Sequence, residues 1–128
     1  MVKQILKIVV LVLIIIVMVY LKLFINQYRE FNRGEEAYSK KNFKDAVVYY
    51  ETSIQFYTPF SSNIKKAIQR MFEIASIYEQ EGNYEYALDV YENLRSALYA
   101  TKSFYQPYSD VINRCDKKIT ELLRILRQ

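Results

Sequence analysis

The chain has 128 residues, a net charge of +4, no His, no Trp and one cysteine, Cys115, which excludes an intramolecular disulfide and a His/Cys zinc or iron–sulfur site. Three of the positive charges, Lys3, Lys7 and Lys22, lie near the N-terminus; the rest of the chain has 15 Lys and Arg against 14 Asp and Glu, which argues against a nucleic-acid partner. Two Gly and two Pro disfavour an all-β fold, and 13 Tyr and 7 Phe are too many for a disordered tail, so we predict an all-α protein.

The first predicted element is a transmembrane helix over Ile5–Ile25. Its centre, Ile8–Leu21, is an uninterrupted run of fourteen apolar residues. A helix of 21 residues is about 31 Å long, which matches the roughly 30 Å hydrocarbon core of a bilayer. Lys22 lies near its end, where a long side chain reaches the headgroups, and Tyr20 and Phe24 stand near the same interface. We therefore predict that residues 1–25 are a tail and a membrane anchor in contact with lipid.

Two alternatives for this stretch are a cleaved signal peptide and a buried core helix. A signal peptide ends at a site of small residues, and none occurs between Val2 and Tyr28. A domain of about 100 residues is also too small to enclose such a helix on all sides. The anchor lacks Gly, Ala, Ser and Thr, the residues that close helix pairing in lipid favours, so the sequence indicates plain anchoring.

The orientation of the anchor is not set by charge alone. The N-terminal tail carries Lys3, Lys7 and the α-amine, whereas the other flank carries more Lys and Arg, interleaved with Glu in a segment expected to fold. A simple count of positive charges favours a cytoplasmic domain. A short basic N-terminal tail favours an extracytoplasmic domain, on a bacterial inner membrane, and we adopt this second interpretation.

The rest of the chain predicts a series of amphipathic helices. Helix is expected to continue from the anchor through Gly34 to about Lys41 as a stiff stalk, the alternative being a break near Asn26. Gly82 is expected just after a helix, where positive φ suits glycine. Pro59 and Pro107 mark breaks, and Ser61, Ser62 or Asn63 is expected to cap the helix after the first of them. The helices expected after the stalk, from apolar residues spaced three or four apart, are 44–56, 64–81, 84–101 and 110–127.

The chain contains an internal repeat. Residues 42–50, NFKDAVVYY, match residues 83–91, NYEYALDVY, at an offset of 41. Residues 56–61, FYTPFS, match residues 104–109, FYQPYS, at an offset of 48. The difference between the two offsets is about two turns of added helix in the second copy.

These residues resemble the tetratricopeptide (TPR) repeat, a helix–turn–helix unit of 34 residues. The second copy fits that family's pattern at Ala75, Tyr78, Gly82, Tyr84, Ala87 and Tyr91. The first copy keeps Gly34, Phe43, Ala46, Tyr50 and Ser53. Departures are Glu30 and Arg33 at large apolar positions, Ala37 at a Tyr position, Leu94 at a small position and a late Pro107. The resemblance implies a domain over 26–128, with repeats at about 30–59 and 68–101 and a capping helix at about 110–127.

The resemblance also implies a binding surface, because TPR arrays commonly bind peptides or helices on the concave face formed by the first helix of each repeat. The residues that map to this face are Phe31, Glu35, Tyr38, Phe72, Ser76 and Glu79. Some family members hold a peptide carboxylate with Asn here, but Glu35 and Ser76 occupy those places, so carboxylate capture is not supported. The alternative for the aromatic residues is core packing. Further aromatic residues, some of which must be exposed and would favour protein contacts, are Tyr49, Tyr57, Phe60, Tyr86, Tyr105 and Tyr108.

The sequence offers little material for catalysis. Without His, nucleophile–base pairs are hard to build, and Cys115 lies on an apolar helical stripe, which predicts a packed and inert thiol. The pairs Glu35–Glu36 and Glu79–Glu81 are predicted to lie on solvated helix faces, and no Gly-rich phosphate loop occurs. We therefore expect no enzyme activity, metal or cofactor.

The function that these patterns favour is a non-enzymatic, membrane-anchored adaptor or scaffold that binds a protein partner at the membrane surface. The alternative is an accessory subunit of an integral membrane complex, with the transmembrane helix packed on helices of its partners. A lipid or cell-wall binding module is a third class.

Overall fold

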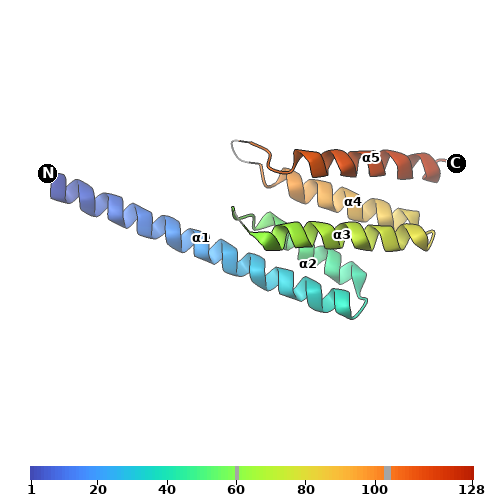
Figure 1. Ribbon diagram of the computed structural model, residues 1–128, viewed down its shortest axis with the longest axis horizontal. Helices are drawn as coiled ribbons and strands as arrows, with labels where there is room; N and C mark the ends of the chain where they lie inside the picture. The colour runs from blue at the N-terminus through green and yellow to red at the C-terminus, as the bar shows by residue number, and fades with distance from the viewer. Residues whose placement is uncertain (60, 103–104) are drawn as a thin grey trace.

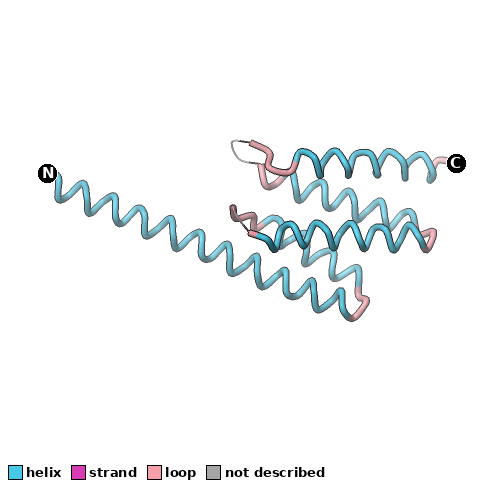
Figure 2. The backbone as a smooth tube through the Cα atoms, in the orientation of Figure 1, coloured by secondary structure: helices cyan, strands magenta, loops and turns pink. Residues whose placement is uncertain are grey.

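The computed structural model describes residues 1–59, 61–102 and 105–128, and this described part forms five helices and no strand (Figures 1 and 2). All the predicted helices are present, with ends that differ from the predicted ones by at most three residues. The all-α fold and the helical domain behind a long apolar helix are therefore confirmed. The helices are α1 (Val2–Ser39), α2 (Phe43–Gln55), α3 (Ser62–Gln80), α4 (Tyr84–Tyr99) and α5 (Ser109–Leu126).

Helix α1 is one unbroken helix of 38 residues, as expected for a stiff stalk. Its N-terminal half projects away from the other helices (Figure 1). The apolar window in this half has a mean hydropathy of 3.2, and none of it is buried within the protein, so α1 is long and apolar enough to cross a membrane. The C-terminal part of α1, from Gln27 onward, packs on α2.

The four remaining helices continue the antiparallel array in chain order, each helix packing on the next. Helices α1, α3 and α5 form one layer, because side chains of α3 contact both α1 and α5. Helices α2 and α4 pack on each other and form the second layer. Helix α5 closes the array and buries Ile112, Cys115 and Leu122 against its neighbours. The Cys115 thiol is thus packed as predicted, and burial raises its pKa to about 11.

The core repeats the internal match of the sequence. Tyr50 and Tyr91, 41 residues apart, are both buried, as are Ala46 and Ala87 one turn before them. Small residues let paired helices approach closely, and a large ring four residues later fills the space beside the contact. The departures at Glu30 and Ala37 are accommodated, because both residues are buried and the Glu30 carboxylate accepts a hydrogen bond of 3.0 Å from Arg33.

The α1–α2 and α3–α4 turns have the same hydrogen bonds. Lys41 N donates to Tyr38 O and Asn42 N to Ala37 O; the corresponding bonds run from Gly82 to Glu79 and from Asn83 to Tyr78. This is the Schellman pattern that ends a helix, and it requires a left-handed residue. Gly82 has the predicted positive φ, 76°, whereas Lys41 adopts φ 60° without being glycine.

The loops that contain the two prolines join the helices at the other end of the array. Residues Phe60, Ser103 and Phe104 of these loops lie outside the described residues. Ser61 is the N-cap residue of α3, but the expected side-chain cap is absent there: its hydroxyl donates instead to the side-chain carbonyl of Gln27 on α1.

Candidate partner-binding face

The layer of α1, α3 and α5 carries all six residues that map to the binding face. Phe31, Glu35 and Tyr38 follow one face of α1, and Phe72, Ser76 and Glu79 follow one face of α3. The α1 residues contact α3, and Phe72 and Glu79 contact α5. Ser76, which lies between Phe72 and Glu79 in the sequence, is half-buried. The six residues therefore lie on α1 and α3, the first helices of the two pairs α1–α2 and α3–α4.

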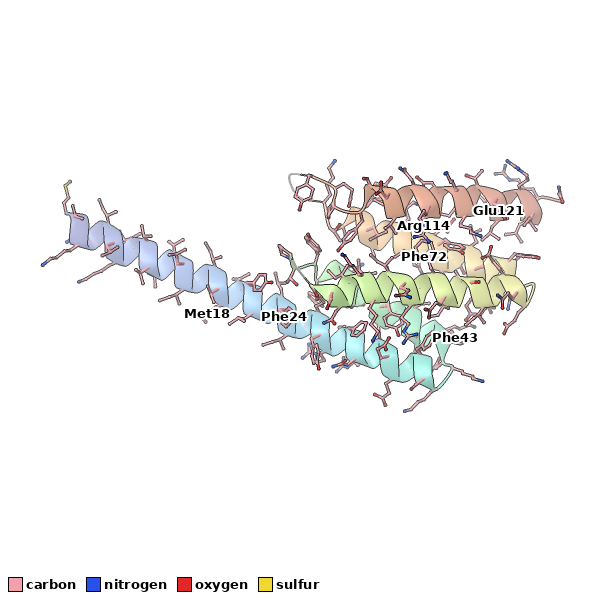
Figure 3. All side chains as sticks on the ribbon, in the orientation of Figure 1. Met18, Phe24, Phe43, Phe72, Arg114 and Glu121 are labelled. Atoms are coloured by element: carbon pink, nitrogen blue, oxygen red, sulfur yellow. The ribbon has the colours of Figure 1, made fainter. Side chains whose placement is uncertain are left out.

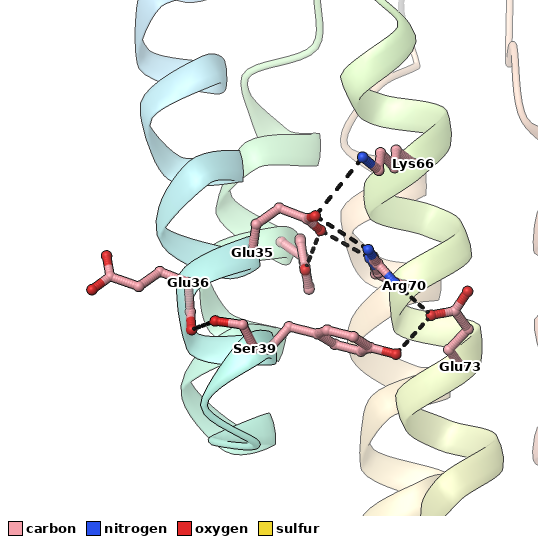
Figure 4. A network of polar contacts seen from close by, with 8 residues as sticks. Glu35, Glu36, Ser39, Lys66, Arg70 and Glu73 are labelled. Carbon is pink, nitrogen blue, oxygen red and sulfur yellow. Dashed lines mark hydrogen bonds and ion pairs between the residues drawn. The ribbon is translucent and has the colours of Figure 1, made fainter.

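A polar network joins α1 to α3, with Glu35 at its centre (Figure 4). The Arg70 guanidinium donates to both oxygens of Glu35, from Nε at 2.9 Å and from Nη2 at 3.2 Å. The Tyr50 hydroxyl donates to the same carboxylate at 2.6 Å, and Lys66 lies 3.8 Å from it. A second acceptor, Glu73, receives bonds from Tyr38 at 2.9 Å and from Arg70 at 3.1 Å. These charge-assisted bonds fix the spacing of the two helices.

The network shifts the ionisation of its members. Burial by itself would raise the pKa of Glu35, but the bonds from Arg70 and Tyr50 outweigh it and the pKa is lowered. The pKa of Tyr50 is raised, first by burial and then by the bond to Glu35. The pKa of Arg70 is raised by its bond to Glu35. Glu35 is therefore a fixed negative charge, half-buried and paired, which corrects the prediction of a solvated face for this residue; Glu36 beside it is exposed as predicted.

The aromatic residues on α1 are held by α3 as well. The Arg70 guanidinium lies over the Tyr38 ring, 4.3 Å from its centroid, and the Lys66 ammonium lies 5.8 Å from the Phe31 ring. Phe31 is only 6% exposed and packs against Tyr50. Phe31 therefore matches the core-packing alternative: its ring belongs to the core beneath this layer and not to the exposed surface.

A groove of about 300 Å³ lies between α3 and α5, and we call it the α3–α5 groove. Its lining residues are Lys65, Ile68, Gln69, Phe72, Tyr108, Val111 and Arg114. The Arg114 guanidinium stacks over the Phe72 ring at 4.3 Å (Figure 3). Lys65 and Arg114 are exposed at its rim, and no acidic residue lines it among the residues described. The groove is thus an apolar floor with a basic rim.

Glu79 lies beyond this groove on α3 and is also paired. It accepts a hydrogen bond of 3.0 Å from the Tyr91 hydroxyl, and Lys118 of α5 lies 3.6 Å from its carboxylate. Burial and this bond raise the pKa of Tyr91. The prediction of a solvated face is therefore wrong for Glu79 and holds for Glu81, which is exposed.

The remaining predicted aromatic residues divide between surface and core. Tyr86 and Tyr105 are exposed, whereas Tyr49, Tyr57 and Tyr108 are partly buried. Phe60 falls outside the described residues. On the opposite layer, Tyr86 lines a smaller pocket of about 240 Å³ with Lys44 and Val48. Across the three described ranges no three His, Cys, Asp or Glu side chains are grouped as a metal site would need.

A model of the soluble NSF attachment protein (SNAP) family matches residues 27–124, more than half of the chain. The chain belongs to this family. A comparison of the SNAP-family chain with curated proteins and with solved structures found no match. The family is one of non-enzymatic adaptors built on helical repeats, so the family match supports a helical-repeat, protein-interaction domain; it does not single out the TPR type.

The cations of this SNAP-family face were missed by the mapping from the TPR pattern. Lys66 and Arg70 stand four residues apart on α3, and Arg114 and Lys118 stand four apart on α5. That spacing puts each pair on one face of its helix. The available signal was thus a pair of basic residues on each helix, but the pairing of Lys66 and Arg70 with Glu35 of α1, and of Lys118 with Glu79 of α3, crosses between helices and could not be assigned from spacing.

Proposed function

We propose that this SNAP-family chain is a membrane-anchored adaptor that binds a protein partner on the α1–α3–α5 layer. In this proposal residues 1–25 form the tail and anchor, with Ile5–Ile25 in the bilayer. Residues 26–128 form a domain of two TPR-type repeats, at about 30–59 and 68–101, and a capping helix at about 110–127. The domain faces the extracytoplasmic side of a bacterial inner membrane, and a reporter fused after Gln128 tests that side.

The observation that carries the proposal is the continuity of α1. The same helix supplies the apolar segment and the first helix of the binding layer, with no joint between them. The Glu35–Arg70 network then ties α3 to α1. A partner held on this layer would therefore be held at a fixed distance and angle from the bilayer.

The α3–α5 groove suggests what the partner contributes. Its floor suits an apolar side chain, and its rim cations, Lys65 and Arg114, suit a carboxylate beside it. Phe72 lines this groove, and Ser76 follows it one turn later on α3. Glu35, Tyr38 and Glu79 position the helices, and Phe31 packs in the core beneath them. We therefore propose a partner segment that is amphipathic and acidic, and that is associated with the same membrane.

Charge reversal on the groove tests the proposal. The full chain is purified from gently solubilised membranes, and the recovered partner is compared between the wild type and a Lys65→Glu, Arg114→Glu variant. Like charges in place of opposite ones should reduce recovery about tenfold or more. The matched control, Lys44→Glu with Lys117→Glu, makes the same charge change away from the groove and should retain the partner. Equal recovery from both variants would refute this face as the binding site.

Replacing the anchor separates the adaptor from the accessory-subunit alternative. When Ile5–Ile25 is exchanged for an unrelated apolar helix of the same length, an adaptor keeps its partner. An accessory subunit, whose helix packs on its partners, loses it. The comparison uses the same recovery measurement, with membrane insertion of the exchanged chain checked by flotation.

A further inference from the structure

Two interhelical loops lie together at the end of the domain from which the apolar half of α1 projects (Figures 1 and 2). The α2–α3 loop spans residues 56–61 and the α4–α5 loop spans residues 100–108. The rings of Tyr57 and Tyr108 join the two loops, with centroids 6.0 Å apart in an edge-to-face arrangement. The two short turns lie at the opposite end (Figure 1).

The α2–α3 loop runs along α1 toward the apolar segment. Gln27 donates from its amide to Phe56 O at 2.9 Å and to the Thr58 hydroxyl at 3.3 Å. Further along, the Tyr20 hydroxyl donates to Pro59 O at 3.0 Å. The Pro59 carbonyl therefore lies at the level of Tyr20, seven residues or about 10 Å nearer the N-terminus than Gln27.

This contact sets the height of the loop relative to a bilayer. Tyr20 lies five residues inside the end of Ile5–Ile25, which corresponds to about 8 Å along the helix. When that segment fills the hydrocarbon core, a carbonyl at the level of Tyr20 lies on the acyl-chain side of the headgroup boundary, by at most about 8 Å. The loop cannot stay in bulk water without the Tyr20–Pro59 contact being broken.

The residues of this end suit such a boundary. Tyr105 is 65% exposed and Tyr99 is 55% exposed, and tyrosine prefers the membrane interface because its ring is apolar and its hydroxyl is polar. Neither loop contains Asp or Glu, and Lys102 adds a positive charge beside anionic headgroups. The opposite end differs, since Glu81 and Glu85 flank the α3–α4 turn there.

We propose that the described residues of the α2–α3 loop (56–59 and 61) and of the α4–α5 loop (100–102 and 105–108) rest in the headgroup interface of the bilayer that α1 crosses, with Tyr105 inserted. The domain then has a second contact with lipid besides its anchor, and one fixed orientation on the membrane surface. This inference rests on the membrane anchoring of the proposed function.

The absence of Trp from the chain allows a direct test by fluorescence. Three full-length variants, each with one tryptophan, are reconstituted in phosphatidylcholine vesicles with and without bromine on the upper acyl chain, and also at the chain ends. Tyr105→Trp reports on the loops and Leu13→Trp on the centre of the anchor. Tyr86→Trp, exposed at the opposite end of the domain, is the matched control.

The expected result is a roughly twofold loss of emission of Tyr105→Trp with bromine near the headgroups, because an interfacial ring lies beside that label. Its emission should be blue-shifted from that of Tyr86→Trp, which should be unquenched. Leu13→Trp should be quenched by bromine at the chain ends.

Each other outcome overturns a stated part. If Leu13→Trp is quenched but Tyr105→Trp is not, the loops lie in water and the inference fails while the anchor stands. If Leu13→Trp is not quenched by either label, the anchoring itself fails. If Tyr86→Trp is quenched as strongly as Tyr105→Trp, the domain has no fixed orientation and the inference is wrong.

Discussion

The ring of Tyr50 lies directly against the backbone of Gly34, where α1 and α2 approach each other. A methyl group added at Gly34 would stand 2.7 Å from two ring carbons of Tyr50. The ring has no room to retreat, because Tyr50 is fully buried and its hydroxyl is bound to Glu35 at 2.6 Å. Gly34 is thus required by packing, even though glycine is a poor residue for a helix interior.

Gly34→Ala should therefore destabilise the domain. Overpacking costs about 1–3 kcal/mol, whereas alanine gains roughly 1 kcal/mol over glycine in a helix interior. We expect a net fall of about 1 kcal/mol in the free energy of unfolding, measured by urea denaturation in detergent micelles with circular dichroism. An increase in stability would show that propensity outweighs the Tyr50 contact.

The second repeat provides the control for this substitution. Ala75 stands 41 residues after Gly34, at the corresponding position of α3, where the chain accommodates a fully buried methyl group. Ala75→Gly removes a buried methyl group and lowers propensity, so it should destabilise by about 1 kcal/mol or more. The two repeats should thus each prefer their own residue.

The Glu35–Arg70 network should make stability depend on pH. The pKa of Glu35 is lowered in the folded protein, so its contribution is present above the ordinary value of 4.5 and is lost as the pH falls through the folded value. Glu35→Gln should lower the free energy of unfolding at neutral pH by about 1–3 kcal/mol, because Arg70 loses a charged acceptor. The variant should also show a flatter decline in acid, measured by urea denaturation at a series of pH values.

Glu51 should respond with the opposite sign. Burial raises the pKa of this carboxyl on α2, so the folded state is penalised when the pH rises through the ordinary value and the group must ionise. Glu51→Gln should therefore stabilise the protein at neutral pH and have little effect well below pH 4.5. A fall in stability at neutral pH would mean that the Glu51 carboxylate has a favourable partner.

The two Schellman turns predict a stabilising substitution. Lys41 has φ 60°, where a side chain costs about 1–2 kcal/mol. Lys41→Gly should therefore raise the free energy of unfolding by about 0.5–2 kcal/mol, the usual range for a single stabilising substitution. Lys40→Gly is the control, because Lys40 has φ −85° and gains nothing from glycine. Gly82→Ala should destabilise through the backbone alone, since no atom lies within 4 Å of its added methyl group.

The helices were predictable because their signals are local. Apolar spacing and the residues Gly82, Pro59 and Pro107 mark the helices and breaks, and the match of Ala46–Tyr50 with Ala87–Tyr91 predicts two similar helix pairs. The family resemblance also placed Glu35, Tyr38, Phe72 and Glu79 on the first helices of the two helix pairs, where they lie, but it did not indicate their partners.

What could not be predicted depends on contacts between distant segments. Gln27 is fully buried because its amide binds the α2–α3 loop, about 30 residues later, and nothing around Gln27 signals this. The Ser61 hydroxyl is diverted from its helix cap by the same residue. Glu35 resembles an ordinary surface carboxylate in sequence, and only the packing of α1 on α3 brings Arg70 to it.

Ser53 provides the last prediction. Its hydroxyl is buried in α2 and, among the residues that the structure describes, has no hydrogen-bond partner. A buried unpaired hydroxyl costs about 1–3 kcal/mol, and alanine also favours helix over serine. Ser53→Ala should therefore raise the free energy of unfolding by about 1 kcal/mol in urea denaturation. Thr52→Ala, whose hydroxyl donates to Val48 O at 2.9 Å, should change it by less than about 0.5 kcal/mol. A loss of stability in Ser53→Ala alone would show that the Ser53 hydroxyl is bound in solution.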